Sequence, residues 1–399
     1  MKPQGSVIIV EPNHGGHRAN HVGIIVRHLR SEGIEPRLLT SQSGLDSGDF
    51  DHLGIEASCF DQIADGHTPY FYSFLPKSLK RRFTIFHQIS SYLKMVRGKT
   101  RCAIFPTLQA SGLVPAGLDT VGYPVPWVGI VMAPKPHLKA CGIATNLSSF
   151  GLWIQRQAYR RLVKQSNCIR IGSFDPLFAQ WINHPKIVYC PDPVNIVSTS
   201  KSNSLVSDTV KPVVLVAGSI DQRKKVCQLA EVLEQVSQST PLHLVIAGKP
   251  CDSMESRLAG SSAIAALKQT NSVDLILRRL TDAEVDQLFQ RADIIWSGNL
   301  RAHGSSGAVV RAGMHSKPVV TMQNSILGNW MESAGGGPVV DMNSASDLRE
   351  IFGKLTGSLE FRQSLGHKNF QLFGQNTEEK YCDLLLSPVQ RLNSVSSTP

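Results

Sequence analysis

Short apolar runs alternate with longer segments of helical periodicity along the whole chain. In the first half, the run Ser6–Val10 precedes a segment with apolar residues at 22, 25, 26 and 29, which is the spacing of one helix face. The run Arg37–Thr40 then resumes the strand pattern, and a strand, a helix and a strand in this order predict parallel pairing. Further strands of this half are expected at 103–106, 127–132, 168–172 and 186–190.

The second half repeats this alternation more regularly. Its strands are expected at 213–217, 242–247, 273–277, 293–296 and 318–322. Thr281 and Glu284 have the spacing of a capping box that opens a helix running to about Arg291. The pattern therefore predicts an α/β fold of two Rossmann-like, doubly wound domains. Ligands of such folds bind at the carboxyl ends of the strands, so we expect the two domains to face each other across a ligand-binding cleft.

A serine-rich segment separates the two halves. Residues 195–210 show no periodicity and follow Pro191-Asp192-Pro193, which is typical of a linker. We therefore expect a first domain at 1–194 and a second at 211–365. Helices follow at 366–386, and residues 387–399 are expected to form a loose tail.

The composition is that of a globular protein. A hydrophobic fraction of 42% provides enough apolar residues for two cores and argues against a largely disordered chain. No apolar run approaches the roughly 20 residues of a membrane span, and the run near the start is too short for a secretory signal. We therefore expect a soluble, cytoplasmic protein. The eight cysteines show no C-x-x-C spacing, which argues against zinc-ribbon and thioredoxin-type sites and favours buried, reduced thiols.

The positive charge is concentrated in the first half. Residues 1–200 hold 21 Lys and Arg against 12 Asp and Glu, whereas residues 201–399 hold 20 against 19. Within the first half, residues 76–101 are basic, free of acidic residues and interleaved with apolar residues at helical spacing. This segment indicates either contact with an anionic membrane surface or a core-facing helix with a solvated basic side. No nucleic-acid-binding motif accompanies it, so no nucleic acid partner is expected.

Three turns between a strand and a helix are candidates for anion binding, because small residues and helix N-termini suit phosphate groups. They are the turn with His14, Gly15, Gly16 and His17, the turn with Arg223 and Lys224, and the turn with Gly304, Ser305, Ser306 and Gly307. Each also has a plain structural interpretation, as an ordinary βα turn, a solvated basic helix start or a tight loop. His17 and His21 have a metal-compatible spacing, but no third ligand stands out, so no metal is expected.

Several enzyme classes lack support. The chain contains no G-x-G-x-x-G, G-x-S-x-G, P-loop, H-E-x-x-H or kinase signature. The sequence therefore gives no support for a dehydrogenase, a serine hydrolase or a P-loop NTPase.

The order of motifs in the second half resembles the donor domain of GT-B glycosyltransferases, especially the retaining family 4. The strand ending at Gly218 with Lys224 after it, and the segments 244–250, 284–293 and 311–320, are similar to successive motifs of that family. The resemblance extends to helices at 366–386 that would pack back on the first domain. In that family two glutamates stand eight positions apart, and here those positions hold His303 and Arg311.

The resemblance implies a glycosyltransferase that moves a sugar from a nucleotide-diphosphate donor to a glycan or lipid-linked acceptor. Retention of configuration, no metal and no cofactor are implied with it. A location at the inner face of the membrane, as a peripheral protein, would suit a lipid-linked acceptor. The alternative is a catalytically degenerate GT-B protein that binds glycans or partners, which the two replaced glutamates motivate; a GT-B sugar-nucleotide epimerase ranks last.

The resemblance and the three turns together imply a set of site residues. His303 and Lys224 would be catalytic. The donor diphosphate would meet Gly15, Gly16, Arg223, Lys224, Gly304, Ser305, Ser306, Gly307 and Arg311. The nucleotide base would lie near Gly248, Arg279 and Leu280, and the acceptor near His14 and His17.

Overall fold

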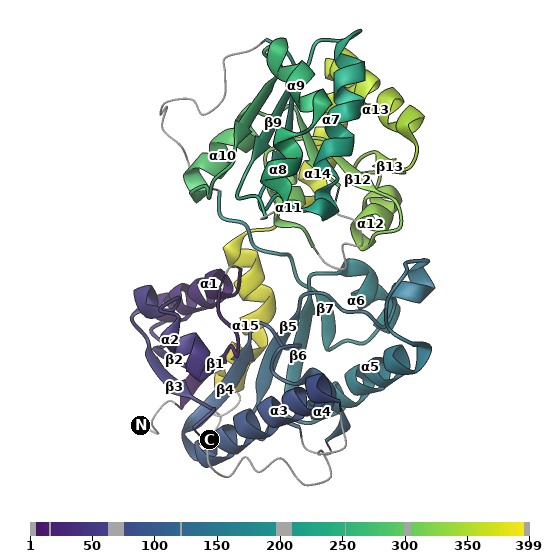
Figure 1. Ribbon diagram of the computed structural model, residues 1–399. Coiled ribbons are helices and arrows are strands. Elements are labelled where there is room, and N and C mark those ends of the chain that lie inside the picture. The colour runs from purple at the N-terminus through teal and green to yellow at the C-terminus, as the bar shows by residue number, and fades with distance from the viewer. Residues whose placement is uncertain are drawn as a thin grey trace. The chain divides into compact units, whose positions relative to one another are not determined.

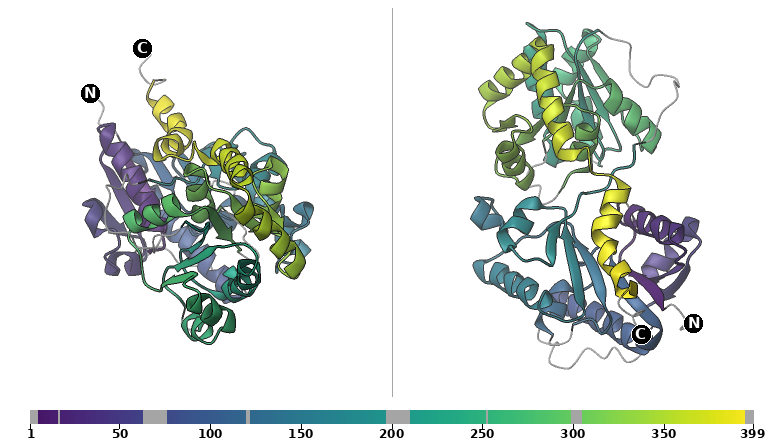
Figure 2. Two further views of the ribbon diagram at one scale, coloured as in Figure 1. Left: turned by 90° about the horizontal axis from the view of Figure 1, so that it is seen from above. Right: turned by 180° about the vertical axis from the view of Figure 1, so that it is seen from behind.

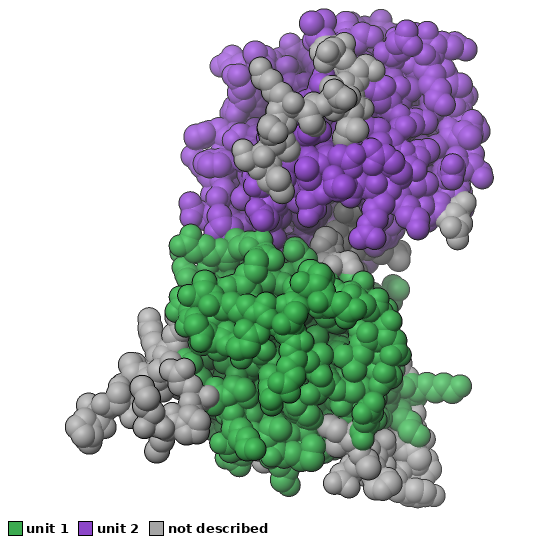
Figure 3. Space-filling model, turned by 90° about the vertical axis from the view of Figure 1, so that its left-hand side faces the viewer, with its two compact units in different colours: residues 1–137, 145–190, 378–399 green, residues 138–144, 191–377 purple. Residues whose placement is uncertain are grey.

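The computed structural model of the chain describes residues 5–15, 17–62, 76–119, 122–196, 210–251, 253–298 and 305–394. These residues form two compact units, which we describe separately (Figure 3). Unit 1 comprises 1–137, 145–190 and 378–399, and unit 2 comprises 138–144 and 191–377. The expected linker at 195–210 lies almost entirely outside the described residues.

Unit 1 is built on a parallel sheet of seven strands in the order β3-β2-β1-β4-β5-β6-β7 (Figure 1). The strands are β1 (Ser6–Val10), β2 (Pro36–Thr40), β3 (Glu56–Cys59), β4 (Thr100–Phe105), β5 (Trp127–Val131), β6 (Cys168–Ser173) and β7 (Ile187–Tyr189). The sequence pattern predicted all of them except β3. That strand lies at the edge of the sheet, and its residues are exposed or half-buried, so it lacks an apolar run.

Helices cover both faces of this sheet. The helices are α1 (His17–Ser31), α2 (Gln42–Asp46), α3 (Lys77–Met95), α4 (Leu113–Leu118), α5 (Ser149–Leu162), α6 (Pro176–Ile182) and α15 (Glu378–Ser394). Helices α3 to α6 share one apolar core with the sheet. Helices α1 and α15 share the other.

Most of the basic segment 76–101 forms helix α3, whose apolar side faces the core of unit 1. Phe86, Ile89 and Leu93 are buried in the core of unit 1, so the apolar side of the helix is occupied by the protein itself. The core-facing interpretation therefore holds for this side of the helix, and contact of the exposed cations with an anionic membrane surface stays a prediction. The cations of the helix lie on its solvated side, as the core-facing interpretation predicted.

Unit 2 contains a second parallel sheet, in the order β10-β9-β8-β11-β12-β13. Its strands are β8 (Val213–Ala217), β9 (His243–Ala247), β10 (Val273–Ile276), β11 (Ile294–Ser297), β12 (Val319–Met322) and β13 (Val339–Val340). The first five were predicted within one or two residues. Strand β13 has only two residues, too few to give a periodic signal.

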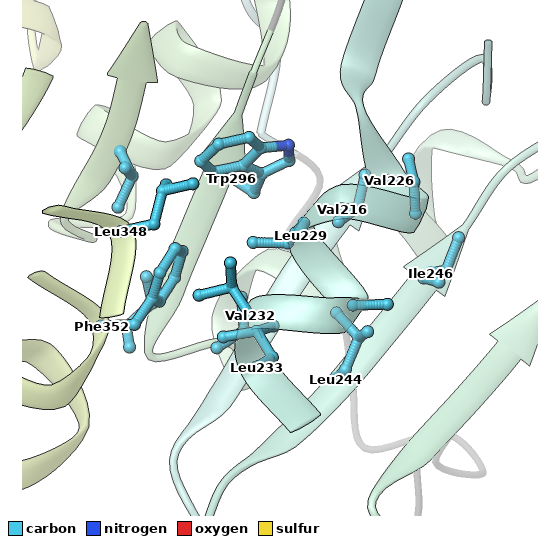
Figure 4. Close-up of a cluster of buried hydrophobic side chains, with 14 of the residues drawn as sticks. Val216, Val226, Leu229, Val232, Leu233, Leu244, Ile246, Trp296, Leu348 and Phe352 are labelled. Atoms are coloured by element: carbon cyan, nitrogen blue, oxygen red, sulfur yellow. The ribbon is translucent and has the colours of Figure 1, made fainter. Parts of the chain in front are cut away.

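Helices again flank both faces. They are α7 (Val226–Ser237), α8 (Met254–Ala259), α9 (Ser262–Gln269), α10 (Asp282–Arg291), α11 (Gly307–Met314), α12 (Ile326–Ala334), α13 (Ala345–Gly357) and α14 (Leu359–Phe373). Helices α7, α8, α9 and α13 enclose the larger core with the strands, where the ring of Trp296 lies 6.0 Å from that of Phe352 (Figure 4). The predicted capping box of α10 is confirmed, since Glu284 N–H donates to Thr281 Oγ1 and Thr281 N–H to Glu284 Oε2.

The end of the chain differs from the sequence prediction. Helix α14 belongs to unit 2, where it packs against α11, and only α15 lies in unit 1, against β5, β6 and α1 (Figure 2). Residues 387–394 are helical rather than a loose tail, because Leu385, Leu386 and Val389 continue an apolar side that is buried in the core of unit 1. Serine and asparagine near this end hide that pattern in the sequence.

The cysteines follow the prediction in part. All eight are free thiols, and Cys102, Cys168, Cys190 and Cys382 are buried. Cys251 is exposed, contrary to expectation, because it follows the end of β9 in a surface turn.

Gly248, at the end of β9 in unit 2, is a position that tolerates no side chain. Gly248 has φ +142°, and an added Cβ would overlap the carbonyl oxygen of Gly218 in the neighbouring turn. We expect Gly248→Ala to lower the free energy of unfolding by about 2 kcal/mol or more, measured by urea denaturation. Gly353→Ala is the matched control, because its Cβ would meet nothing within 4 Å and it lies inside α13. Equal stability of the two variants would contradict the prediction.

Candidate functional site

The carboxyl ends of β8, β9, β10 and β11 lie at one edge of the sheet of unit 2, since these four strands are neighbours and run parallel. The turn after β8 begins at Gly218, which has φ +92°. It runs through a short 3-10 turn, Gln222–Lys224, into α7. It is held beside the loop after β9, because Ile220 N–H donates to Lys249 O at 2.9 Å and Cys251 N–H to Ile220 O at 2.9 Å.

Lys224 is the central cation of this edge. Its ammonium group donates a hydrogen bond to the carbonyl oxygen of Ala217, the last residue of β8. Its own carbonyl oxygen accepts a hydrogen bond from the indole Nε1 of Trp296, at 2.8 Å, so the turn is anchored to β11. Burial lowers the pKa of Lys224 to about 8. The side chain is therefore charged at neutral pH but poorly solvated, and an added anion would stabilise its charge.

Arg223 lies next to Lys224 but in a different environment. Its guanidinium group forms an ion pair with Asp221 at 2.6 Å, and 73% of its side chain is exposed. That carboxylate balances the charge of Arg223 locally. The structure therefore distinguishes the two cations that the sequence presented as one clamp. Lys224 is half-buried at the strand end, and Arg223 is a paired surface residue.

The region expected for the nucleotide base lies at the same edge. Gly248 N–H donates to Ile276 O at 2.9 Å, which joins the end of β9 to the end of β10. Arg279 and Leu280 follow β10, with Arg279 exposed and Leu280 packed against the apolar cluster under α10 and α11. The structure thus brings Gly248 and the loop with Arg279 together.

The turn before α11 is described only from Ser305 onwards, and His303 and Gly304 lie outside the described residues. Ser305 Oγ donates to Asp192 Oδ2 at 2.6 Å. Ser306 is the N-cap residue of α11, but its side chain makes no capping hydrogen bond. The first turn of α11 therefore lacks a side-chain cap at its positive end, and Gly307, its first residue, follows the strand next to β8.

Arg311 does not stand free beside this turn. It forms an ion pair with Asp286 of α10, a fully buried residue whose Oδ1 also lies 3.4 Å from His315 Nε2. The buried carboxylate balances the charge of Arg311, which counts against the prediction that this residue binds the diphosphate. Asp286 was not singled out from the sequence, because an aspartate in an amphipathic helix resembles an ordinary surface residue.

The turn after β1 holds the residues predicted to meet the acceptor and part of the diphosphate. His14 Nδ1 lies 3.3 Å from Asp49 Oδ2 on the surface, and Gly15 has φ +85°. Gly16 and the side chain of His17 lie outside the described residues. These positions belong to unit 1, whereas the Lys224 edge belongs to unit 2.

Two buried polar groups at the carboxyl edge of unit 1 were missed by the sequence analysis. Glu11, directly after β1, is fully buried; its Oε1 accepts Asn13 N–H at 3.1 Å, and its Oε2 has no hydrogen-bond partner among the described residues. Burial raises the pKa of Glu11 to about 7, against smaller opposing effects of Thr107, Asn13 N–H and Arg18. His137, after β5, lies with its Nε2 2.9 Å from Asp175 Oδ2, and both side chains are buried. Nothing in a local pattern indicates such burial.

The described residues contain no group of three or more His, Cys, Asp or Glu that could hold a metal ion. They also contain no helix that is long and apolar enough to cross a membrane.

The pKa of Glu11 leads to a prediction about stability. Its carboxyl group is protonated in the folded protein up to about pH 7 but ionises in the unfolded chain near its ordinary pKa of 4.5. The folded state therefore binds more protons between these values, and stability falls as pH rises from about 5 to 7. Glu11→Gln should remove this loss, on the order of 3 kcal/mol at pH 7.5. Unfolding titrations at pH 5 and 7.5 measure it, with the exposed Glu32→Gln as control; identical pH dependence in wild type and Glu11→Gln would refute it.

Comparison with known proteins supplies the family context. Residues 211–355, which all belong to unit 2, match the family model described as Glycosyl transferases group 1. No curated protein matches the chain by sequence.

Solved structures match over the whole chain. Anabaena HepE in complex with UDP is 12% identical, with 98% of this chain and 100% of that chain covered and a TM-score of 0.64. A glycosyltransferase from Rickettsia africae is 13% identical, with 98% and 97% covered and a TM-score of 0.61. WaaG, a glycosyltransferase involved in lipopolysaccharide biosynthesis, is 15% identical, with 95% and 99% covered and a TM-score of 0.57. The chain therefore has the two-unit, Rossmann-like GT-B fold of these enzymes, and its residues 211–355 resemble the glycosyl transferases group 1.

Proposed function

We propose that the protein is a glycosyltransferase that moves a sugar from a nucleotide-diphosphate donor to a glycan or lipid-linked acceptor. We further propose retention of configuration at the anomeric carbon and a reaction without a metal. One observation carries the proposal. The half-buried Lys224 places its ammonium group at the carboxyl end of β8, in the unit that matches the glycosyltransferase family model.

The chemistry of sugar transfer explains why this cation is suited to the task. As the bond to the sugar breaks, negative charge accumulates on the leaving nucleoside diphosphate. A partly desolvated ammonium group interacts with that charge more strongly than a fully solvated one. The first turn of α11, which follows the N-cap residue Ser306, adds backbone amide groups and the positive end of a helix dipole. This helix comes after β11, the strand next to β8.

UDP is the donor nucleotide that we propose first. The HepE structures hold UDP, in one case together with glucose. The name of another structural neighbour, a trehalose-phosphate synthase from Burkholderia vietnamiensis, describes it as UDP-forming. We place the base near Gly248 and Arg279, where the end of β9 is joined to the end of β10. The catalytic role of His303 stays a prediction.

One observation favours the alternative of a GT-B protein that binds but does not catalyse. Arg311 replaces an acidic residue of the family pattern, and Asp286 occupies its guanidinium group. Arginine accepts no hydrogen bond, so it cannot hold ribose hydroxyls as a carboxylate does. Donor hydrolysis or transfer decides between the two functions, since a degenerate protein would bind UDP without turning over any UDP-sugar.

We propose that unit 1 receives the acceptor, with a peripheral position at the inner face of the membrane. The support is electrostatic. The exposed side of α3 carries Lys77, Lys80, Arg81 and Arg82, and no acidic residue lies on that helix. Helix α5 adds an exposed aromatic pair, Phe150 and Trp153, of the kind found at membrane interfaces.

UDP binding tests the proposed function directly. At a hundred times its dissociation constant, UDP should stabilise the protein by about 2.7 kcal/mol, seen as a rise of the thermal midpoint. Lys224→Ala should abolish most of this rise, whereas Arg223→Ala should have a small effect because that side chain is exposed and paired. Lys268→Ala, an exposed lysine of α9, is the matched control. No rise with UDP, GDP, ADP or CMP would overturn the proposal.

The pKa of Lys224 predicts how UDP binding depends on pH. The ammonium group is charged below about pH 8 and neutral above it, so affinity should fall as pH rises from 7 to 9. Loss of one charged contact corresponds to about a tenfold fall. Calorimetric titrations at the two pH values measure the effect. The fall should disappear in Lys224→Ala, and a fall of the same size in that variant would show that another group is responsible.

A further inference from the structure

A pocket of about 450 Å³ opens at the carboxyl edge of the sheet in unit 1. Its walls come from the loops after β1, β2 and β3 on one side and from the first three turns of α3 on the other. The volume is in the range of sites for small ligands. Phe60 and Ile85 contribute apolar surface to the pocket, and most of its other lining residues are polar or charged.

Three cations line this pocket from one side of α3. Lys77, Lys80 and Arg81 stand at helix positions three and four apart, so their side chains project from the same face. Within the described part of the chain, none of the three has an ion pair or a side-chain hydrogen bond. The one carboxylate in the lining is Asp61, whose Oδ2 accepts Gln42 N–H at 2.7 Å.

This arrangement is unfavourable without a ligand. Like charges three and four residues apart repel each other on a helix. Lys77 is the first residue of α3, where a cation opposes the helix dipole, and the N-cap residue Pro76 supplies no side-chain cap. The apolar side of α3 is buried independently of these cations, so packing does not require them.

The surroundings extend the positive potential beyond the pocket. Residues 66–174 contain 15 Lys and Arg and one acidic residue, Asp119. A concave site within such a region concentrates anions. Gln88, which also lines the pocket, adds an amide that can donate to an oxygen.

We propose that this pocket binds a phosphate group carried by the acceptor, either a sugar phosphate or the phosphate of a lipid headgroup. Lys77, Lys80 and Arg81 hold the phosphate oxygens, and Gln88 with the wall of Phe60 contacts the attached group. The assignment to the acceptor rests on the proposed function, but the binding of phosphate by the pocket does not require a donor.

Calorimetric titration of the full chain with glucose 6-phosphate, inorganic phosphate and glucose tests the pocket without any nucleotide. We expect a phosphate-bearing probe to bind and glucose to bind far more weakly. The double variant Lys80→Ala, Arg81→Ala should weaken binding by about tenfold or more, the effect of losing charged contacts. Lys94→Ala is the matched control, because it removes an exposed cation of the same helix outside the pocket.

Vesicle sedimentation distinguishes the two sources of phosphate. Vesicles of phosphatidylcholine with and without phosphatidylglycerol are mixed with the wild type, the double variant and Lys94→Ala. Binding of glucose 6-phosphate alone supports a soluble acceptor. Binding of anionic vesicles that the double variant loses and Lys94→Ala keeps supports a lipid headgroup.

Two results would overturn the proposal. One is that no phosphate-bearing probe binds. The other is that Lys94→Ala loses as much binding as the double variant, which would indicate a general attraction to a basic surface. Neither result bears on UDP binding at Lys224, so failure of the donor site and failure of this pocket are separate outcomes.

Discussion

The candidate site depends on one half-buried cation. Lys224 is held at the end of β8 by the Ala217 carbonyl and by the indole of Trp296, which is itself packed in the larger core of unit 2. The turn that carries it can lie so close to the next loop because Gly218 and Gly248 have no side chains. The position of the charge is therefore a consequence of core packing and of backbone geometry together.

Charge balance separates the two units. In unit 2, two of the cations near the candidate donor edge have carboxylate partners, Arg223 with Asp221 and Arg311 with Asp286. In unit 1, the three cations of the α3 pocket have none among the described residues. The buried carboxylate of Asp286 needs its partner, because an unpaired buried charge is costly. The α3 cations are exposed and stay solvated without one, so they remain available to an anionic ligand.

Much of the fold followed from periodicity alone. Eleven of the strands were visible as apolar runs, and the turn with Lys224 was recognisable because it lies between a buried strand and a helix. The edge strand β3 and the two-residue β13 were missed, since neither has enough buried positions to leave a pattern. The helical continuation past residue 386 was missed because Pro388 and polar residues surround Val389, the residue there that continues the buried side.

The sequence by itself determined the alternation of strands and helices, the two parallel sheets and the loops at which ligands of such sheets bind, because these depend on local spacing. Only the tertiary structure decided which charges of those loops remain available. Arg311 and Asp286 are 25 residues apart and meet through the packing of α11 on α10, and Glu11 loses its solvent only when β1 is enclosed. Burial and pairing of charges arise from contacts between distant segments, and no local pattern encodes them.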